Sequence, residues 1–281
     1  MQEQEQGQEH EQGQVHEQRQ EQNPMDIRTA LFLAAVCGQT YAQFHNPQHW
    51  FMLPRTYMTV GPFSAEVYNG VVEPFGFVIE SDRAAILAFR GTGSAVDWVS
   101  DLIAEQIAYK PVTDAGQTHH GFTDIYMSAR QAIHGLLDQL PVDKPLFVTG
   151  HSLGGALATL AALDIAANRN HKQLIVYTFA APRVGDPKFV RKYNHTVPYH
   201  VRIQNEFDIV PHLPPLLYRS PRTEKTYAYL HVKGESPLSF RTGSVGGNHI
   251  LSSYFADMAR QAPAFAAAIC AEPPGWCPVE N

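Results

Sequence analysis

Residues 144–168 join an apolar run, a glycine-rich turn and an alanine- and leucine-rich run without a break: KPLFVTG, HS and LGGALATLAALDIAAN. The first run predicts a buried strand and the last a helix. Ser152 at such a turn takes a strained backbone conformation, and only small neighbours such as Gly150 and Gly154 fit beside it. The turn exposes the serine hydroxyl and directs the N–H of Leu153 towards a developing oxyanion. Ser152 is therefore a candidate nucleophile; alternatively, the glycines only allow close packing and Ser152 caps the helix.

Strands and helices alternate along the rest of the chain. Strands are expected at 65–72, 75–81, 84–92, 144–150, 173–180, 199–204 and 226–232, with 75–81 and 84–92 paired as a hairpin. Helices are expected at 122–140, 153–168, 186–194 and 248–260. This order predicts an α/β fold in which helices cover both faces of a mostly parallel central sheet. No linker divides residues 25–281, which we expect to form a single domain.

The N-terminal residues 1–24 differ sharply in composition from this body. They contain the related units EQGQEH, EQGQVH and EQRQEQ, a Gln/Glu-rich repeat with almost nothing to bury, and we expect a disordered tail. The tail carries most of the net charge of −6, so the body is nearly neutral and offers no basic face for nucleic acid. No apolar run reaches the roughly 18–20 residues that span a bilayer, so we expect a protein without a transmembrane segment that is soluble or binds membranes only at their surface. We also expect it to be a monomer, located in the cytoplasm or exported by another route.

Two further features leave alternatives open. The stretch MDIRTALFLAAVCGQTYAQF, residues 25–44, has apolar residues at helical spacing and predicts a packed amphipathic helix, although a signal peptide is the other interpretation. Cys37 lies in this stretch and is expected to be a buried thiol. Cys270 and Cys277 could pair if the protein is exported, and no histidines accompany them, so we expect no metal site.

A nucleophilic serine needs a base and an acid, which in this fold class follow it in the order acid, then histidine. Asp208 follows the strand at 199–204 and is the expected acid, with Glu206 as a rival. His249 opens the final helix and is the expected base, whereas His212 shares the loop of the acid. Other acidic residues are less suitable: Asp164 lies on the helix that Ser152 starts, Asp186 is expected to cap a helix and Asp257 lies within one.

Several blocks together resemble the class 3 lipases of the fungal triacylglycerol lipase type. They are FRGTGSAVDWVSDL, HHGF, VTGHSLGGALATLAAL, FAAPRVGD, NEFDIVPHLPP and NHILSSY, which occur in the order of the family across roughly residues 26–260. The resemblance implies an α/β-hydrolase fold with a catalytic triad of Ser152, Asp208 and His249. It also implies that Thr92, directly after FRG, and Leu153 form the oxyanion hole. The alternative for Thr92 is a turn residue between Gly91 and Gly93.

The segment SAVDWVSDLIAE, residues 94–105, aligns with the lid of this family, a short helix over the active site. Val96, Val99 and Leu102 lie on one side of such a helix, with Trp98 close by. A lid of this kind shields the site in water and turns its apolar face to a lipid surface. An ordinary surface helix is the alternative.

These observations predict a serine hydrolase that cleaves carboxylic esters of lipids through an acyl-enzyme on Ser152, without a metal or organic cofactor. The resemblance favours a triacylglycerol lipase acting at a lipid–water interface. A feruloyl or short-chain carboxylesterase and a phospholipase A1 are alternatives on the same fold. A binding protein that has lost its catalysis is an alternative of another class, which the presence of all three triad residues disfavours.

Overall fold

The computed structural model describes residues 25–67, 70–92 and 105–278. Its centre is a seven-stranded sheet in the order β1-β2-β3-β6-β7-β8-β11. The pairs β1–β2 and β2–β3 are antiparallel, and every pair from β3 to β11 is parallel. The strands are β1 (Met58–Glu66), β2 (Val72–Glu80), β3 (Ala85–Phe89), β6 (Leu146–His151), β7 (Leu174–Phe179), β8 (Tyr199–Asn205) and β11 (Glu235–Leu238).

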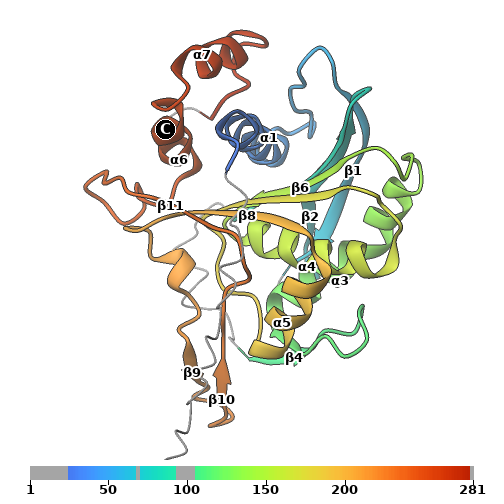
Figure 1. Ribbon diagram of the computed structural model, residues 1–281, viewed down its shortest axis with the longest axis vertical. Helices are drawn as coiled ribbons and strands as arrows, with labels where there is room; N and C mark the ends of the chain where they lie inside the picture. The colour runs from blue at the N-terminus through green and yellow to red at the C-terminus, as the bar shows by residue number, and fades with distance from the viewer. Residues whose placement is uncertain (1–24, 68–69, 93–104, 279–281) are drawn as a thin grey trace, which may run out of the picture.

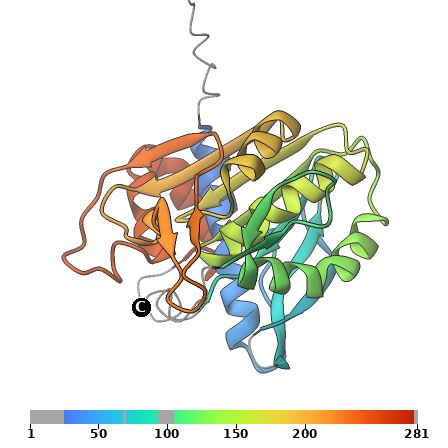
Figure 2. The same ribbon diagram turned by 90° about the horizontal axis from the view of Figure 1, so that it is seen from below.

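Two small antiparallel sheets lie outside this central sheet. One pairs β4 (Gln106–Ala108) with β5 (Gln117–His119), and the other pairs β9 (Leu217–Arg219) with β10 (Thr226–Ala228). The β9–β10 pair stands away from the central sheet (Figure 1). Viewed from below, the strands β1 and β2 lie at one side of the molecule, and β8 and β11 lie at the other (Figure 2).

Helices cover both faces of the sheet, as the alternating pattern predicted. One face carries α3 (His120–Leu137), α4 (Leu153–Asn168) and α5 (Pro187–Thr196) (Figure 1). The other carries α1 (Ile27–His45), α6 (Leu251–Ala259) and α7 (Pro263–Ala271). Successive side chains of β3 enter opposite cores, since Leu87 packs in the core beneath α4 whereas Ile86 packs in the core beneath α1.

The segment at residues 25–44 forms the expected helix. Asp26 caps α1 by accepting hydrogen bonds from the backbone N–H groups of Arg28 and Thr29. One side of the helix is fully buried against the sheet, and Cys37 on that side is the buried thiol that the sequence predicted. In the part of the chain that the structure describes, no helix is long and apolar enough to cross a membrane.

Three expectations about individual elements were wrong. Residues 65–72 are not one strand, because β1 ends at Glu66 and β2 begins at Val72. The earlier part of β1 contains Gly61 and Pro62 and pairs with β2 in an irregular register. Glycine and proline are unfavourable in strands, so residue propensities did not predict a strand here, but an edge strand tolerates them. Within 226–232 only 226–228 form a strand, and it joins the small sheet; β11 with Pro237 occupies the edge of the central sheet instead. The helix α7 was not expected.

The C-terminal segment is tied to α1 and closed by a disulfide. Cys270 and Cys277 pair, which settles the alternative that the sequence left open. Between them, Trp276 is completely buried in the core beneath α1. The side-chain amide of Gln39 on α1 donates to the carbonyl oxygens of Gly275 and Trp276, at 3.2 and 2.9 Å. These contacts hold the end of the described chain against the helix that begins it.

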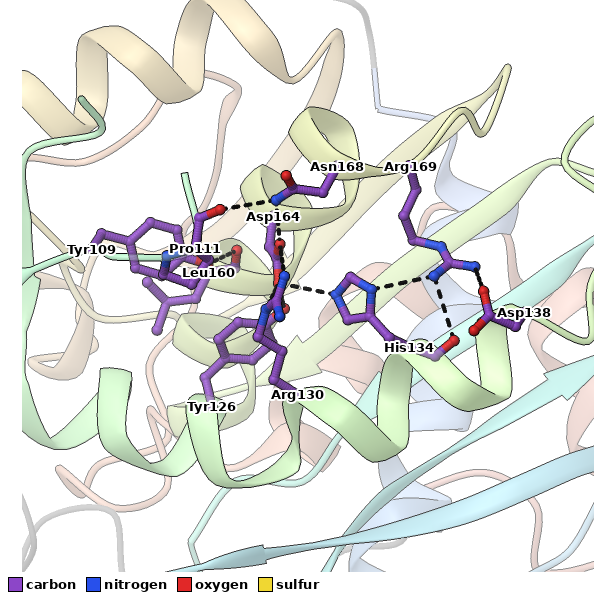
Figure 3. A network of polar contacts seen from close by, with 10 residues as sticks. All are labelled: Tyr109, Pro111, Tyr126, Arg130, His134, Asp138, Leu160, Asp164, Asn168 and Arg169. Atoms are coloured by element: carbon purple, nitrogen blue, oxygen red, sulfur yellow. Dashed lines mark hydrogen bonds and ion pairs between the residues drawn. The ribbon is translucent and has the colours of Figure 1, made fainter. Parts of the chain in front are cut away.

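A buried polar network joins α3 to the helix α4 that follows Ser152 (Figure 3). Its centre is the fully buried carboxylate of Asp164, which accepts two hydrogen bonds from Arg130, at 2.6 and 2.9 Å. Tyr126, His134 and Asn168 also contact this carboxylate, at 2.5, 3.0 and 2.7 Å. Burial by itself raises the pKa of Asp164. The hydrogen bonds to the carboxylate together lower the pKa by more than burial raises it, so the group titrates well below its usual range.

Candidate active site

The turn from β6 to α4 has the strained geometry that its sequence predicts. Ser152 has φ 58° and ψ −126°, a conformation that L-residues rarely adopt, and it stands directly before the first residue of α4. A Cβ atom on Gly150 would lie 2.2 Å from the carbonyl oxygen of Gly154, and one on Gly154 would lie 2.3 Å from that of Phe89. Both glycines are therefore required for the approach of α4 to β3 and β6.

The structure brings Ser152, His249 and Asp208 together, although they come from three separate loops. The His249 Nε2 atom lies 2.9 Å from the Ser152 Oγ, and the His249 Nδ1 atom lies 2.7 Å from the Asp208 Oδ2. Ser152 and Asp208 are fully buried and His249 is 4% exposed. With Nδ1–H donating to the carboxylate, Nε2 carries the lone pair and accepts from the serine hydroxyl, which suits a serine activated by a histidine base.

Three hydrogen-bond donors hold the carboxylate of Asp208. Its Oδ1 accepts from the backbone N–H of Val210 at 2.9 Å, and its Oδ2 accepts from His249 and from the hydroxyl of Tyr254 at 2.8 Å. The same hydroxyl accepts from the backbone N–H of Asn205 at 2.9 Å. Burial and the negative charge of Asp208 raise the pKa of Tyr254 well above its usual value, so the phenol stays protonated and donates.

Tyr254 was missed by the sequence analysis. It lies on α6, five positions after His249, where an apolar pattern suggests only a core aromatic. The strand β8 ends at Asn205, and its turn places Asp208 beside that helix. Only the packing of α6 on β8 shows that the hydroxyl reaches the carboxylate.

The two residues expected to bind an oxyanion lie after the end of β3 and at the start of α4. Thr92 follows β3, and its hydroxyl oxygen is buried without a hydrogen-bond partner among the described residues. Leu153 is the first residue of α4, where a backbone N–H has no acceptor within the helix. The preceding residue, Gly91, lies close to the nucleophile candidate, since a Cβ atom on Gly91 would lie 3.2 Å from the Cβ of Ser152.

The other residues considered as the catalytic acid or base have different contacts. The carboxylate of Glu206 accepts from Ser239 at 3.2 Å, and His212 is exposed at the end of a short 3₁₀ helix, Val210–His212. Asp186 caps α5 as expected, with Pro187 as the first helical residue. Asp164 points into the network between α3 and α4.

The expected lid residues Val96, Trp98, Val99 and Leu102 lie outside the described residues. Across the ranges that the structure does describe, no group of three or more histidine, cysteine, aspartate or glutamate side chains could hold a metal ion.

The sequence of this chain is similar to those of known lipases and phospholipases. A family model described as Lipase (class 3) matches residues 86–218. A lipase of Rhizomucor miehei is 40% identical over 147 residues, which are 50% of this chain and 40% of that protein. The phospholipase A1-II 1 of Oryza sativa subsp. indica is 31% identical over 166 residues, which are 50% of this chain and 42% of that protein.

The fold is also similar to that of a solved lipase. The structure of lipase II from Rhizopus niveus superposes with a TM-score of 0.59 at 28% identity, covering 69% of this chain and 78% of that one. The chain spans only about two fifths of the length of the two curated relatives above.

Proposed function

Because this chain belongs to the class 3 lipase family and has the α/β-hydrolase fold, we propose that it hydrolyses carboxylic esters of lipids through an acyl-enzyme on Ser152. One observation carries the proposal. The buried ring of His249 bridges the Ser152 Oγ, at 2.9 Å, and the Asp208 Oδ2, at 2.7 Å. A histidine held in this way by a carboxylate can remove the serine proton and return it to a leaving group.

The mechanism follows from the tautomer. As the Ser152 Oγ attacks the ester carbonyl carbon, its proton passes to the His249 Nε2, and Asp208 stabilises the resulting imidazolium. The oxygen of the tetrahedral intermediate is bound by the hydroxyl and N–H of Thr92 and the N–H of Leu153. The intermediate then breaks its bond to the alcohol, which takes the proton from His249. Water attacks the acyl-enzyme with the same base and releases the carboxylic acid and free Ser152.

Long-chain acylglycerols at a lipid–water interface are the proposed substrates. Ile209 directly follows Asp208 and Ile250 directly follows His249, and these two side chains are 48% and 41% exposed. Leu216 and Leu217, on the same connection as Asp208, are 56% and 69% exposed. Apolar side chains gathered on loops next to a triad favour contact with a lipid surface.

We also propose that residues 94–105 cover this site as a lid and that the protein acts as a monomer.

A phospholipase A1 is the second candidate, since a protein so named in rice is among the relatives. The two candidates are separated by measuring fatty acid release from triolein emulsions and from phosphatidylcholine vesicles. A triacylglycerol lipase releases acid mainly from triolein, and a phospholipase A1 mainly from the sn-1 position of the phospholipid. A series of p-nitrophenyl esters from acetate to palmitate then gives the preferred chain length.

Replacing Ser152 by alanine tests the reaction class. Ser152→Ala removes the nucleophile, so we expect ester hydrolysis to fall at least about a thousandfold, while the thermal unfolding transition is retained. Wild-type protein should also react with a fluorophosphonate at Ser152, detected by mass spectrometry of the tryptic peptide. Retention of most of the turnover by the alanine variant would show that the acyl-enzyme mechanism is wrong.

A further inference from the structure

His151, next to Ser152, is a buried histidine that the proposed reaction does not use. Its side chain is 4% exposed, and both ring nitrogens lie at hydrogen-bond distance from a partner. The Nε2 atom lies 2.8 Å from the backbone carbonyl oxygen of His249, and the Nδ1 atom lies 2.7 Å from the hydroxyl of Tyr41. His151 therefore connects helix α1 to the main chain of the proposed catalytic base.

The partners of the ring determine its tautomer. A carbonyl oxygen only accepts, so the His151 Nε2 must carry the hydrogen and donate it to His249. The neutral ring then has its lone pair on Nδ1, which accepts from the Tyr41 hydroxyl. Burial and the nearby His249 lower the pKa of His151 to about 3, so the ring stays neutral at any ordinary working pH.

Tyr41 also contacts the strand that leads to the oxyanion threonine. The backbone N–H of Gly91, one residue before Thr92, donates to the phenol oxygen, and this hydrogen bond opposes the rise in the pKa of Tyr41 that burial causes. A Cβ atom on Gly91 would lie 2.1 Å from that oxygen. A continuous chain of donors thus runs from Gly91 to Tyr41, to His151 and to the carbonyl of His249.

The neighbouring residue Arg90 anchors the same strand end to α1. Its guanidinium lies 3.8 Å from the ring centre of Phe44 on α1, and it pairs with Glu73 at 2.7 Å. The last turns of α1 therefore contact both halves of the site, the oxyanion strand through Gly91 and Arg90 and the base through His151. No local pattern in the sequence requires this arrangement, because Tyr41 and His151 lie 110 positions apart.

We propose that Tyr41 and His151 are positioning residues, which hold the imidazole of His249 and the oxyanion strand at Thr92 in fixed relation on either side of Ser152. The inference rests on the proposed ester hydrolysis. Neither residue contacts the reacting atoms. Their effect is exerted through the His249 carbonyl and the Gly91 N–H, and a shift of the base by about 1 Å lowers turnover about a hundredfold.

Two substitutions at His151 separate its two hydrogen bonds. The side-chain amide nitrogen of glutamine is as far from Cβ as the His151 Nε2, so His151→Gln can still donate to His249. Asparagine ends one bond earlier, so His151→Asn can accept from Tyr41 but cannot reach the carbonyl. The loop of His249 keeps other anchors in both variants, since the Asn248 side chain accepts from the N–H of Thr242 at 2.9 Å and donates to the Phe207 carbonyl at 3.1 Å.

The expected result is a fall in kcat rather than a rise in KM. His151→Asn and Tyr41→Phe should lower kcat on a dissolved ester about 10- to 100-fold, with KM within about threefold of wild type. His151→Gln should keep kcat within about threefold. Tyr109→Phe is the matched control, because it loses a buried hydroxyl bonded to the Leu160 carbonyl at 2.7 Å, and we expect its kcat to be unchanged. Equal kcat in His151→Asn and His151→Gln would overturn the proposal.

A second measurement needs no substrate and so distinguishes failure of this inference from failure of the proposed function. The proton between the His249 Nδ1 and Asp208 is expected as a low-field NMR signal, assigned by its loss in His249→Ala. It should shift or broaden in Tyr41→Phe and His151→Asn and be kept in His151→Gln. If wild type hydrolyses no ester, the proposed function fails, and this signal still decides the positioning role. An unchanged signal in His151→Asn would contradict it.

Discussion

At the scale of single residues, Tyr254 holds Asp208, the proposed catalytic acid, in a fixed position. Its hydroxyl satisfies the N–H of Asn205 at the end of β8 and donates to Asp208, so one group joins the strand end to the carboxylate. The Asp208 Oδ2 consequently has two donors, Tyr254 and His249. A carboxylate held from both sides keeps the imidazole in one orientation.

Replacing this tyrosine by phenylalanine should affect both stability and catalysis. Tyr254→Phe leaves the buried N–H of Asn205 without an acceptor, which we expect to lower the free energy of unfolding by about 1–3 kcal/mol. It also removes a donor from Asp208, so kcat/KM should fall at least about tenfold. Urea unfolding and ester hydrolysis at one pH measure the two effects.

Tyr193→Phe is the appropriate control for Tyr254→Phe. The Tyr193 hydroxyl is also buried and bonds to the His200 Nδ1 at 2.8 Å, outside the triad. A similar loss of stability with unchanged kcat/KM is expected. If both variants keep full activity, the hydroxyl of Tyr254 has no part in orienting Asp208.

At the scale of secondary-structure elements, α3 and α4 are joined by a buried charged residue, Asp164, on the helix that follows Ser152. Asp164 lies twelve positions after Ser152 and is held by Arg130, Tyr126 and His134 from α3. A buried carboxylate that loses its charge leaves Arg130 without its partner, which is costly in a low dielectric. The network therefore fixes α4 relative to α3 more than apolar packing alone does.

Asp164→Asn should destabilise the protein and change its response to acid. At pH 7 we expect the free energy of unfolding to fall by about 3–5 kcal/mol. The pKa of Asp164 is lower in the folded state than the usual value of about 4, so wild type loses stability as the pH falls below about 4 while the unfolded chain takes up the proton. The variant lacks this contribution, and its stability should depend less on pH between about 5 and 3.

Asp138→Asn provides the comparison for that prediction. Asp138 pairs with Arg169 at 2.6 Å but is well exposed, so its removal should have little effect on urea midpoints. A wild-type acid response in Asp164→Asn would show that other carboxylates cause the loss of stability.

At the scale of the whole molecule, three of the exposed apolar side chains support the proposed contact with a lipid surface. Leu217 on the β9–β10 pair is 69% exposed, and the exposed Ile209 and Ile250 directly follow the proposed catalytic residues Asp208 and His249. All three lie on connections beyond the carboxyl ends of the central strands, or next to them, where this fold class places its active site. These positions support the proposal that this end of the sheet contacts a lipid surface.

Leu217→Glu tests the proposed lipid face. The added charge should weaken contact with a lipid surface, so hydrolysis of emulsified tributyrin should fall about fivefold or more. Hydrolysis of dissolved p-nitrophenyl acetate should stay unchanged, because Leu217 is not among the proposed triad or oxyanion residues. Val142→Glu is the control, since Val142 is 51% exposed and lies before β6, at the opposite end of that strand from Ser152. Equal losses in both variants, or losses on the dissolved ester, would exclude this face.

Local sequence determined the features that depend on neighbouring residues. The run from Leu146 to Asn168 predicted β6, the strained turn at Ser152 and α4, because strand and helix periodicity and the small size of glycine act over a few positions. The chain order of acid and histidine then selected Asp208 and His249, which the structure brings within hydrogen-bond distance of each other. The class of fold followed from the alternation of strands and helices.

Only the tertiary structure decided the features that join distant parts of the chain. Tyr41 reaches His151 across 110 positions, and Tyr254 reaches Asp208 across 46, so no periodicity shows them. The edge strand β11 contains a proline and is recognised only from its pairing with β8. In each case a side chain or strand that is unremarkable in its own segment acquires its role from a partner on another element, because hydrogen bonding in a packed interior depends on distance in space rather than along the chain.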